Sequence, residues 1–151
     1  MKIIFRLIII LSILLFSNCN GKKEKAIILD STSLEEQMIE AYNKGVKALD
    51  EGDVLFAAKN FNAAENLYPQ SIWAPRSILM ASYSFYSQDY YGDAISELSR
   101  FLKNYPINEN TAYAYFLLAT CYYELIIDEK KDLSPLLKSK ENFQIILDKY
   151  P

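Results

Sequence analysis

Two stretches of this chain repeat the same order of side-chain types at an offset of 37 residues. Small residues and turn formers recur at matching places, and each copy closes with a proline. The matched pairs are Gly45 and Ser82, Ala48 and Phe85, Gly52 and Asp89, Val54 and Tyr91, Ala57 and Ala94, Phe61 and Leu98, Ala64 and Phe101, and Pro69 and Pro106. Because so many positions agree in order at one offset, the chain is predicted to be built from a repeated structural unit.

The order within each copy is typical of a tetratricopeptide repeat, in which two helices are joined by a short turn and which recurs about every 34 residues. A third and looser copy contains Ser139, Phe143, Ile146 and Pro151. The sequence therefore predicts an all-α fold, a tetratricopeptide-repeat solenoid of about three helix–turn–helix pairs within residues 33–151. The pairs are expected at about 38–71, 75–108 and 111–151.

Apolar residues at helical spacing predict where the individual helices begin and end. Ser33 and Glu36 form a capping box for the first helix. Either Asn108 or Asn110 is expected to cap the fifth helix, which is apolar nearly all round and should be buried on both sides. The expected helices cover about 33–51, 54–67, 71–88, 91–105, 111–127 and 136–150.

The third copy differs from the first two in its turn and at its end. A charged insertion, Asp128 to Asp132, lengthens the turn. Pro151, unlike Pro69 and Pro106, is not followed by another helix, whereas a solenoid normally ends in a helix with a polar outer face. We therefore expect that the repeats continue beyond residue 151, or that the last pair packs against a partner.

The N-terminal residues have the features of an export signal. Lys2 and Arg6 are followed by an apolar run over residues 7–16, which is shorter than the roughly 20 residues that cross a bilayer. The run ends near Cys19, a position that resembles the lipobox of bacterial lipoproteins. This resemblance implies a signal peptide over residues 1–18, lipid attachment at Cys19, and a flexible tether over residues 19–32.

The alternative for this segment is a simple secreted protein whose Cys19 is incidental. The second cysteine, Cys121, lies in a nearly wholly apolar segment and is expected to be a small buried hydrophobic residue. A disulfide between the two cysteines is the other interpretation.

The composition argues against catalysis and against nucleic-acid binding. The chain has no histidine, no glycine-rich phosphate loop and no cysteine pair at metal-binding spacing, so no catalytic residue, metal site or cofactor is predicted. The net charge is −3, and no basic stripe runs along the body of the chain. A surface for binding peptides or proteins is the remaining functional class.

In stacked helix pairs the first helix of each pair lines the concave side, so its side chains are the candidates for such a surface. Tyrosine and arginine are common at binding hot spots, because they offer a large contact area with a polar tip. The alternative is that the tyrosines only pack between neighbouring helices. The candidate residues are Ile39, Tyr42, Val46, Arg76, Leu79, Tyr83 and Tyr86.

The joint order of motifs along the chain resembles one family. After the lipobox cysteine and the tether come Tyr42-x-x-Gly45-x-x-Ala48-Leu49-x-x-Gly52-Asp53, Tyr68-Pro69-x-Ser71-x-Trp73-Ala74, Tyr90-Tyr91-x-Asp93-Ala94-Ile95, and Ala112-Tyr113-Ala114-Tyr115. This order is similar to that of the BamD family, also called ComL or YfiO, the tetratricopeptide lipoproteins of the β-barrel assembly machine. The resemblance covers residues 19–151.

Membership of this family would imply a lipoprotein on the periplasmic face of the outer membrane. The implied partners are BamA, the other Bam subunits, the C-terminal segments of outer-membrane β-barrel proteins, and the membrane lipid that holds acylated Cys19. In the family the N-terminal repeats are associated with substrate recognition and the C-terminal repeats with docking on BamA. The alternative is another periplasmic tetratricopeptide lipoprotein that coordinates cell-envelope or division enzymes.

Overall fold

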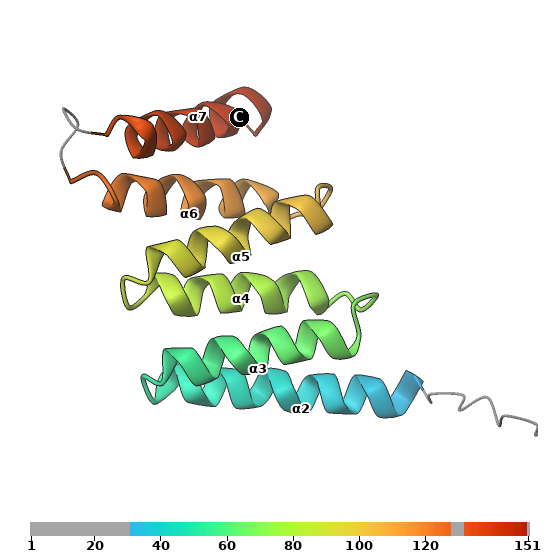
Figure 1. The fold of residues 1–151 in the computed structure, drawn as a ribbon. Coiled ribbons are helices and arrows are strands. Elements are labelled where there is room, and N and C mark those ends of the chain that lie inside the picture. Colours follow the sequence, from blue (N-terminus) through green and yellow to red (C-terminus); the bar gives the residue numbers. More distant parts are fainter. Residues whose placement is uncertain (1–30, 128–131, 151) are drawn as a thin grey trace, which may run out of the picture.

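The computed structural model describes residues 31–127 and 132–150, which form six α-helices and no strand. The helices stack in chain order, and each packs chiefly against the helix before it and the helix after it (Figure 1). This arrangement confirms the predicted all-α solenoid of helix pairs. The helices are α2 (Ser31–Asp50), α3 (Val54–Leu67), α4 (Ala74–Tyr86), α5 (Tyr91–Asn104), α6 (Thr111–Glu124) and α7 (Ser134–Lys149).

The turns inside the first two pairs have the same backbone geometry. Gly52 has φ +81° and Asp89, 37 residues later, has φ 63°, so both residues lie in the left-handed region. Asp53 follows the first of these turns and caps α3, because its Oδ1 accepts a hydrogen bond from the Phe56 amide at 3.1 Å. The two turns therefore reverse the chain in the same way and place α3 and α5 at equivalent positions.

The first core cluster joins α2, α3 and α4 around small side chains. Its buried members are Ala48, Ala57, Ala58, Phe61 and Ala81. Gly45 lies against the ring of Phe61, and a Cβ atom at this glycine would stand 2.8 Å from the ring carbons. The missing side chain thus lets α2 and α3 approach closely.

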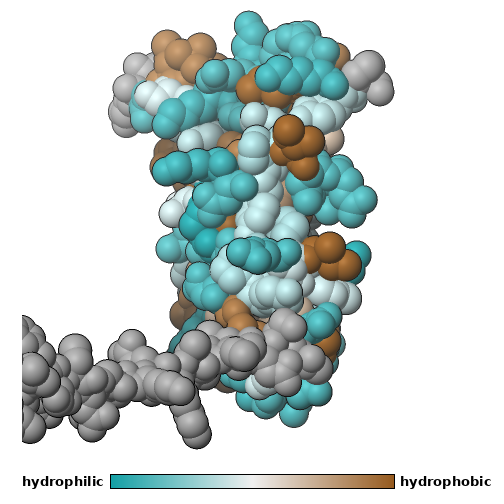
Figure 2. Space-filling view, turned by 90° about the vertical axis from the view of Figure 1, so that its right-hand side faces the viewer, coloured by the Kyte–Doolittle hydropathy of each residue, from teal (hydrophilic) through white to brown (hydrophobic). Residues whose placement is uncertain are grey.

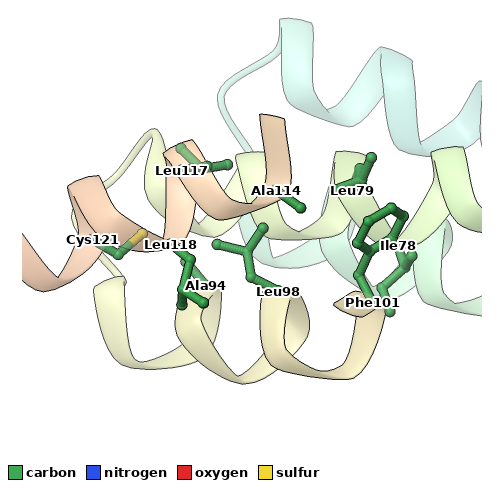
Figure 3. Packing of buried hydrophobic residues seen from close by; sticks show 9 residues of the cluster. All are labelled: Ile78, Leu79, Ala94, Leu98, Phe101, Ala114, Leu117, Leu118 and Cys121. Atoms are coloured by element: carbon green, nitrogen blue, oxygen red, sulfur yellow. The ribbon is translucent and has the colours of Figure 1, made fainter. Parts of the chain in front are cut away.

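The second core cluster joins α4, α5 and α6 and is built from larger aliphatic side chains (Figure 3). Cys121 is fully buried within it, as expected from the sequence, and burial raises the pKa of its thiol to about 12. The members of the cluster are Ile78, Leu79, Ala94, Leu98, Phe101, Ala114, Leu117, Leu118 and Cys121.

A polar network links α3 to α5, the second helices of adjacent pairs. Arg100 forms ion pairs with Glu65 and with Glu97, the latter at 2.6 Å, and also donates to Asn62 Oδ1 at 2.8 Å. The carboxyl of Glu65 is almost completely buried and accepts a second bond from the Tyr105 hydroxyl at 3.2 Å. The network provides the buried carboxylate with partners from the neighbouring repeat.

On the edge of the solenoid that carries the turns between pairs, hydrophobic residues form separate spots among hydrophilic ones (Figure 2). Ile72 and Ile107 in these turns are almost fully exposed. Scattered exposed apolar residues of this kind are normal on protein surfaces. Among the described residues, no helix is both long enough and apolar enough to span a bilayer.

Several predicted helix ends were wrong. Ser33 lies inside α2, where its hydroxyl accepts from the Gln37 amide at 3.2 Å, so no capping box forms at this place. The fourth helix ends at Tyr86 rather than near 88, because the left-handed turn at Asp89 begins there. The sixth helix ends at Glu124 rather than 127.

Two expected caps act differently from the prediction. Ser71 accepts from the Trp73 amide in the turn before α4, and Trp73 rather than Ser71 is the residue at the cap position. Asn110 occupies the cap position of α6 without a side-chain bond, whereas Asn108 Oδ1 accepts from the Asn110 amide at 2.9 Å. These polar residues order the turns between pairs instead of capping the helices directly.

The last pair is less enclosed than the first two. The prediction that α6 is buried on both sides was wrong, because Phe116 and Tyr123 are exposed. Phe143 of α7 is 36% exposed, whereas Leu98, at the equivalent position of α5, is fully buried. Residues 128–131 of the charged insertion lie outside the described residues, as do the predicted signal peptide, Cys19 and the tether up to residue 30.

Candidate functional site

The first helix of each pair contributes to one candidate surface, which we call the A-helix face. We define it by Ile39 and Tyr42 of α2, Arg76 and Tyr83 of α4, and Tyr113 of α6. Ile39, Arg76 and Tyr113 occupy the same position in successive repeats, 37 residues apart, and all three are exposed. The face therefore presents an aliphatic, a cationic and an aromatic side chain in register along the stack.

A small apolar pocket lies where α2 meets the start of α4, and we call it the Trp73 pocket. It has a volume of about 130 Å³ and is lined by Met38, Ile39, Tyr42, Asn43 and Trp73. The side chain of Met38 is fully buried, whereas Ile39 stands at the surface. The ring of Tyr42 meets Trp73 edge-on at 5.5 Å between centroids and Phe61 at 5.2 Å, which holds the wall of the pocket in place.

Arg76 places a positive charge beside this pocket. Its guanidinium carbon lies 5.1 Å from the centroid of the Trp73 ring, within the range of a cation–π interaction. Burial raises the pKa of the Tyr42 hydroxyl, and the nearby charge of Arg76 acts in the opposite direction. Because the Arg76 side chain is exposed, its charge remains open to a carboxylate from outside the chain.

A second group of aromatic side chains lies further along α4, and we call it the tyrosine cluster. The rings of Tyr83 and Tyr86 are 6.4 Å apart, and Tyr86 lies 6.0 Å from Tyr91 of α5. Burial raises the pKa of Tyr113 from α6, and the hydroxyls of Tyr83 and Tyr86 raise it further. The pKa of Tyr91 is raised to about 12 by its hydrogen bond to Asp89.

The structure thus brings Tyr42 and Arg76 together at the Trp73 pocket, and Tyr83 and Tyr86 together in the tyrosine cluster. Two other candidates contribute little surface. Leu79 is only 7% exposed and belongs to the core cluster between α4 and α6, and half-buried Val46 packs against the first core cluster. Leu79 shares a helical stripe with Arg76 and Tyr83, but α6 covers it.

Tyr113 was missing from the sequence-based candidates although it is 44% exposed beside Tyr83 and Tyr86. The repeat itself contained the signal, because Tyr113 follows Arg76 by 37 residues as Arg76 follows Ile39. The candidate list stopped at the second pair and so omitted the third helix of the face.

The arrangement is suited to binding rather than to chemistry. Within residues 31–127 and 132–150, no three His, Cys, Asp or Glu side chains are placed to hold a metal ion. Every buried polar side-chain atom in this part of the chain has a hydrogen-bond partner, so none is left aimed at a ligand. The face offers rigid aromatic rings, hydroxyl groups and one exposed arginine, which are typical components of a binding hot spot.

Residues 34–151 match the family described as YfiO, outer membrane lipoprotein. A curated relative, the outer membrane protein assembly factor BamD of Caulobacter vibrioides, is 33% identical over 136 residues, covering 89% of this chain and 43% of the relative. The assembly factor of the same name from Rickettsia prowazekii is 32% identical over 138 residues, covering 91% of this chain and 53% of the relative. The one from Xylella fastidiosa is 26% identical over 120 residues.

The chain spans about half the length of the curated relatives that it matches. The family match covers all the helix pairs that carry the A-helix face. The chain therefore belongs to the YfiO family of outer membrane lipoproteins.

Proposed function

We propose that this chain takes part in the assembly of β-barrel proteins into the outer membrane, the role named for its curated relatives. It binds unfolded segments of the barrel proteins on the A-helix face and acts as a scaffold for BamA and the other Bam subunits. The observation that supports this role is the combination of an apolar pocket, an exposed arginine and an aromatic cluster on one face of a rigid solenoid.

The Trp73 pocket and Arg76 suit the C-terminal end of a barrel protein. A pocket of about 130 Å³ accommodates one large apolar side chain. A free carboxylate next to that side chain would pair with the guanidinium of Arg76, in the geometry that arginine favours. The tyrosine cluster then offers hydroxyl groups and ring faces to the residues that precede the C-terminus.

Membrane attachment follows from the N-terminal sequence and is part of the same proposal. Signal cleavage after residue 18 leaves Cys19 to receive lipid, and acyl chains hold the chain on the periplasmic face of the outer membrane. Two or more chains give stable anchoring, because one chain alone binds a membrane only marginally. The tether then positions the solenoid close to the membrane surface.

A peptide titration followed by NMR tests the binding step. The ligand is a synthetic peptide that copies the C-terminal end of an outer-membrane β-barrel protein and ends in an aromatic residue. Its addition should shift the indole resonance of Trp73 and the backbone resonances near Arg76, Tyr83 and Tyr113. Shifts confined to α3 and α5, or no shifts at all, would contradict the assignment of the A-helix face.

A further inference from the structure

The Trp73 pocket leads into a shallow hollow along α2. The hollow is lined by Glu36, Ile39, Glu40, Asn43, Lys44 and Lys47. Ile39 and Asn43 line both the hollow and the pocket, so the two form one continuous path on the surface of α2. The pocket is apolar, whereas the hollow carries two exposed carboxylates, Glu36 and Glu40. A segment that fits this path therefore has apolar side chains on one side of a basic stretch.

The chain contains such a segment immediately before α2, among the residues outside the described part. Ala26-Ile27-Ile28-Leu29 is an uncharged apolar run, and Lys22, Lys23 and Lys25 precede it. Neither the predicted signal peptide nor the helix pairs account for this run. Its branched side chains match the size of the pocket, since a cavity of roughly 150 Å³ accepts a benzene molecule and this one measures about 130 Å³.

We propose that residues 26–29 fold back along α2 and place one branched side chain in the Trp73 pocket, so that the tether competes with incoming peptide for this site. The proposal rests on the proposed function only for the identity of the competing ligand. When the tether is in place, Lys22, Lys23 and Lys25 lie near Glu36 and Glu40, and opposite charges favour this docked position. Asp30, between the apolar run and α2, is a residue type common in turns.

The distance to be covered is within the reach of the segment. From Ser31 to Met38, α2 rises about 1.5 Å per residue and thus about 10 Å in all. Four extended residues span roughly 13 Å at about 3.3 Å each. Because the segment is joined to the helix that bears the pocket, its effective concentration there is on the order of millimolar, and a weak contact is enough for substantial occupancy.

Trp73 is the only tryptophan of the chain, so its fluorescence reports on the pocket directly. The experiment uses the chain from residue 19 with Cys19→Ser, which prevents acylation. The test variant carries Ile27→Ser, Ile28→Ser and Leu29→Ser, and the matched control carries valine at the same three positions. All of these changes precede α2 and leave the helix pairs intact.

The serine variant should show a red-shifted Trp73 emission and stronger quenching by acrylamide, whereas the valine control should match the parent chain. Affinity for the C-terminal barrel peptide should rise about threefold in the serine variant, because the pocket is no longer partly occupied. Identical emission and quenching in all three proteins would overturn the proposal, whether or not the peptide binds. Altered emission without peptide binding to any of them would uphold tether docking and contradict the proposed function instead.

Discussion

Gly52 and Asp89 lie 37 residues apart and both adopt a left-handed backbone conformation, with φ +81° and φ 63°. A repeat that is visible in the sequence thus corresponds to a repeat in backbone geometry. The turn fixes the angle at which the second helix of each pair returns along the first. The positions of α3 and α5, and hence the register of the A-helix face, depend on it.

Replacing Gly52 by alanine should destabilise the fold, because a side chain in the left-handed region costs about 1 kcal/mol or more. Gly92→Ala is the matched control, since it also faces open space but lies in α5 without a positive φ. It should be neutral or stabilising by up to about 1 kcal/mol. Urea denaturation measures both, and equal losses in the two variants would show that the turn geometry does not matter.

The contact between Gly45 and Phe61 predicts an overpacking effect with a specific rescue. Gly45→Ser should cost about 1–3 kcal/mol, because the added Cβ would lie 2.8 Å from the Phe61 ring. The equivalent residues of the next repeat are Ser82 and Leu98, both fully buried. The double variant Gly45→Ser with Phe61→Leu should therefore recover part of the loss. A double-mutant cycle measures this coupling, and strictly additive losses would refute it.

The pairing of Arg100 with Glu65 predicts that Arg100→Met destabilises the stack. Glu65 is only 4% exposed, so the variant leaves a buried carboxylate with the Tyr105 hydroxyl as its remaining side-chain partner. The expected loss is about 2 kcal/mol, less than for a fully buried pair because Arg100 is partly open to solvent. Adding Glu65→Gln should restore part of it. Thermal unfolding of the single and double variants decides, and an unaffected single variant would contradict the role of the network.

High pH should weaken the fold through Cys121 and Tyr105. Burial raises the pKa of the Cys121 thiol from 9.0 to about 12. Burial, followed by the effect of Glu65, raises the pKa of Tyr105 from 10.0 to about 12. The folded chain keeps protons that the unfolded chain has lost, so stability is complete below about pH 9 and falls as pH approaches 12. Urea unfolding at a series of pH values measures the slope.

The variant Cys121→Ala separates the contribution of the thiol to this slope. It should lose stability at neutral pH because it leaves a small cavity, and its stability should fall less between about pH 9 and 11 than that of the parent chain. An unchanged slope would show that the thiol titrates alike in the folded and unfolded states.

The parts of the fold that were predicted correctly depend on local signals. Val54 to Leu67 was predicted as a helix and forms α3 over those same residues, because Gly52-Asp53 and Pro69 delimit it on both sides. Cys121 was placed in the core from its apolar neighbours. Helix periodicity, turn formers and proline stops are properties of short segments, and the sequence displays them directly.

The errors arose where neighbouring helices decide the outcome. Leu79 has the helical phase of a surface residue, but the packing of α6 on α4 buries it, and its phase alone does not reveal this. The ends of α4 and α6 depend on turn geometry such as that of Asp89. The predicted capping box failed because α2 begins before Ser33.

Calorimetric titration with the C-terminal barrel peptide tests the central claim most directly, because it compares two exposed aromatic residues on different faces. Tyr113→Ala alters the A-helix face, whereas Phe56→Ala alters α3, and the two side chains are 44% and 48% exposed. The account predicts about tenfold weaker binding for Tyr113→Ala and for Arg76→Gln, as expected for hot-spot residues, and unchanged binding for Phe56→Ala. Equal affinity in all three variants, or a loss only in Phe56→Ala, would contradict it.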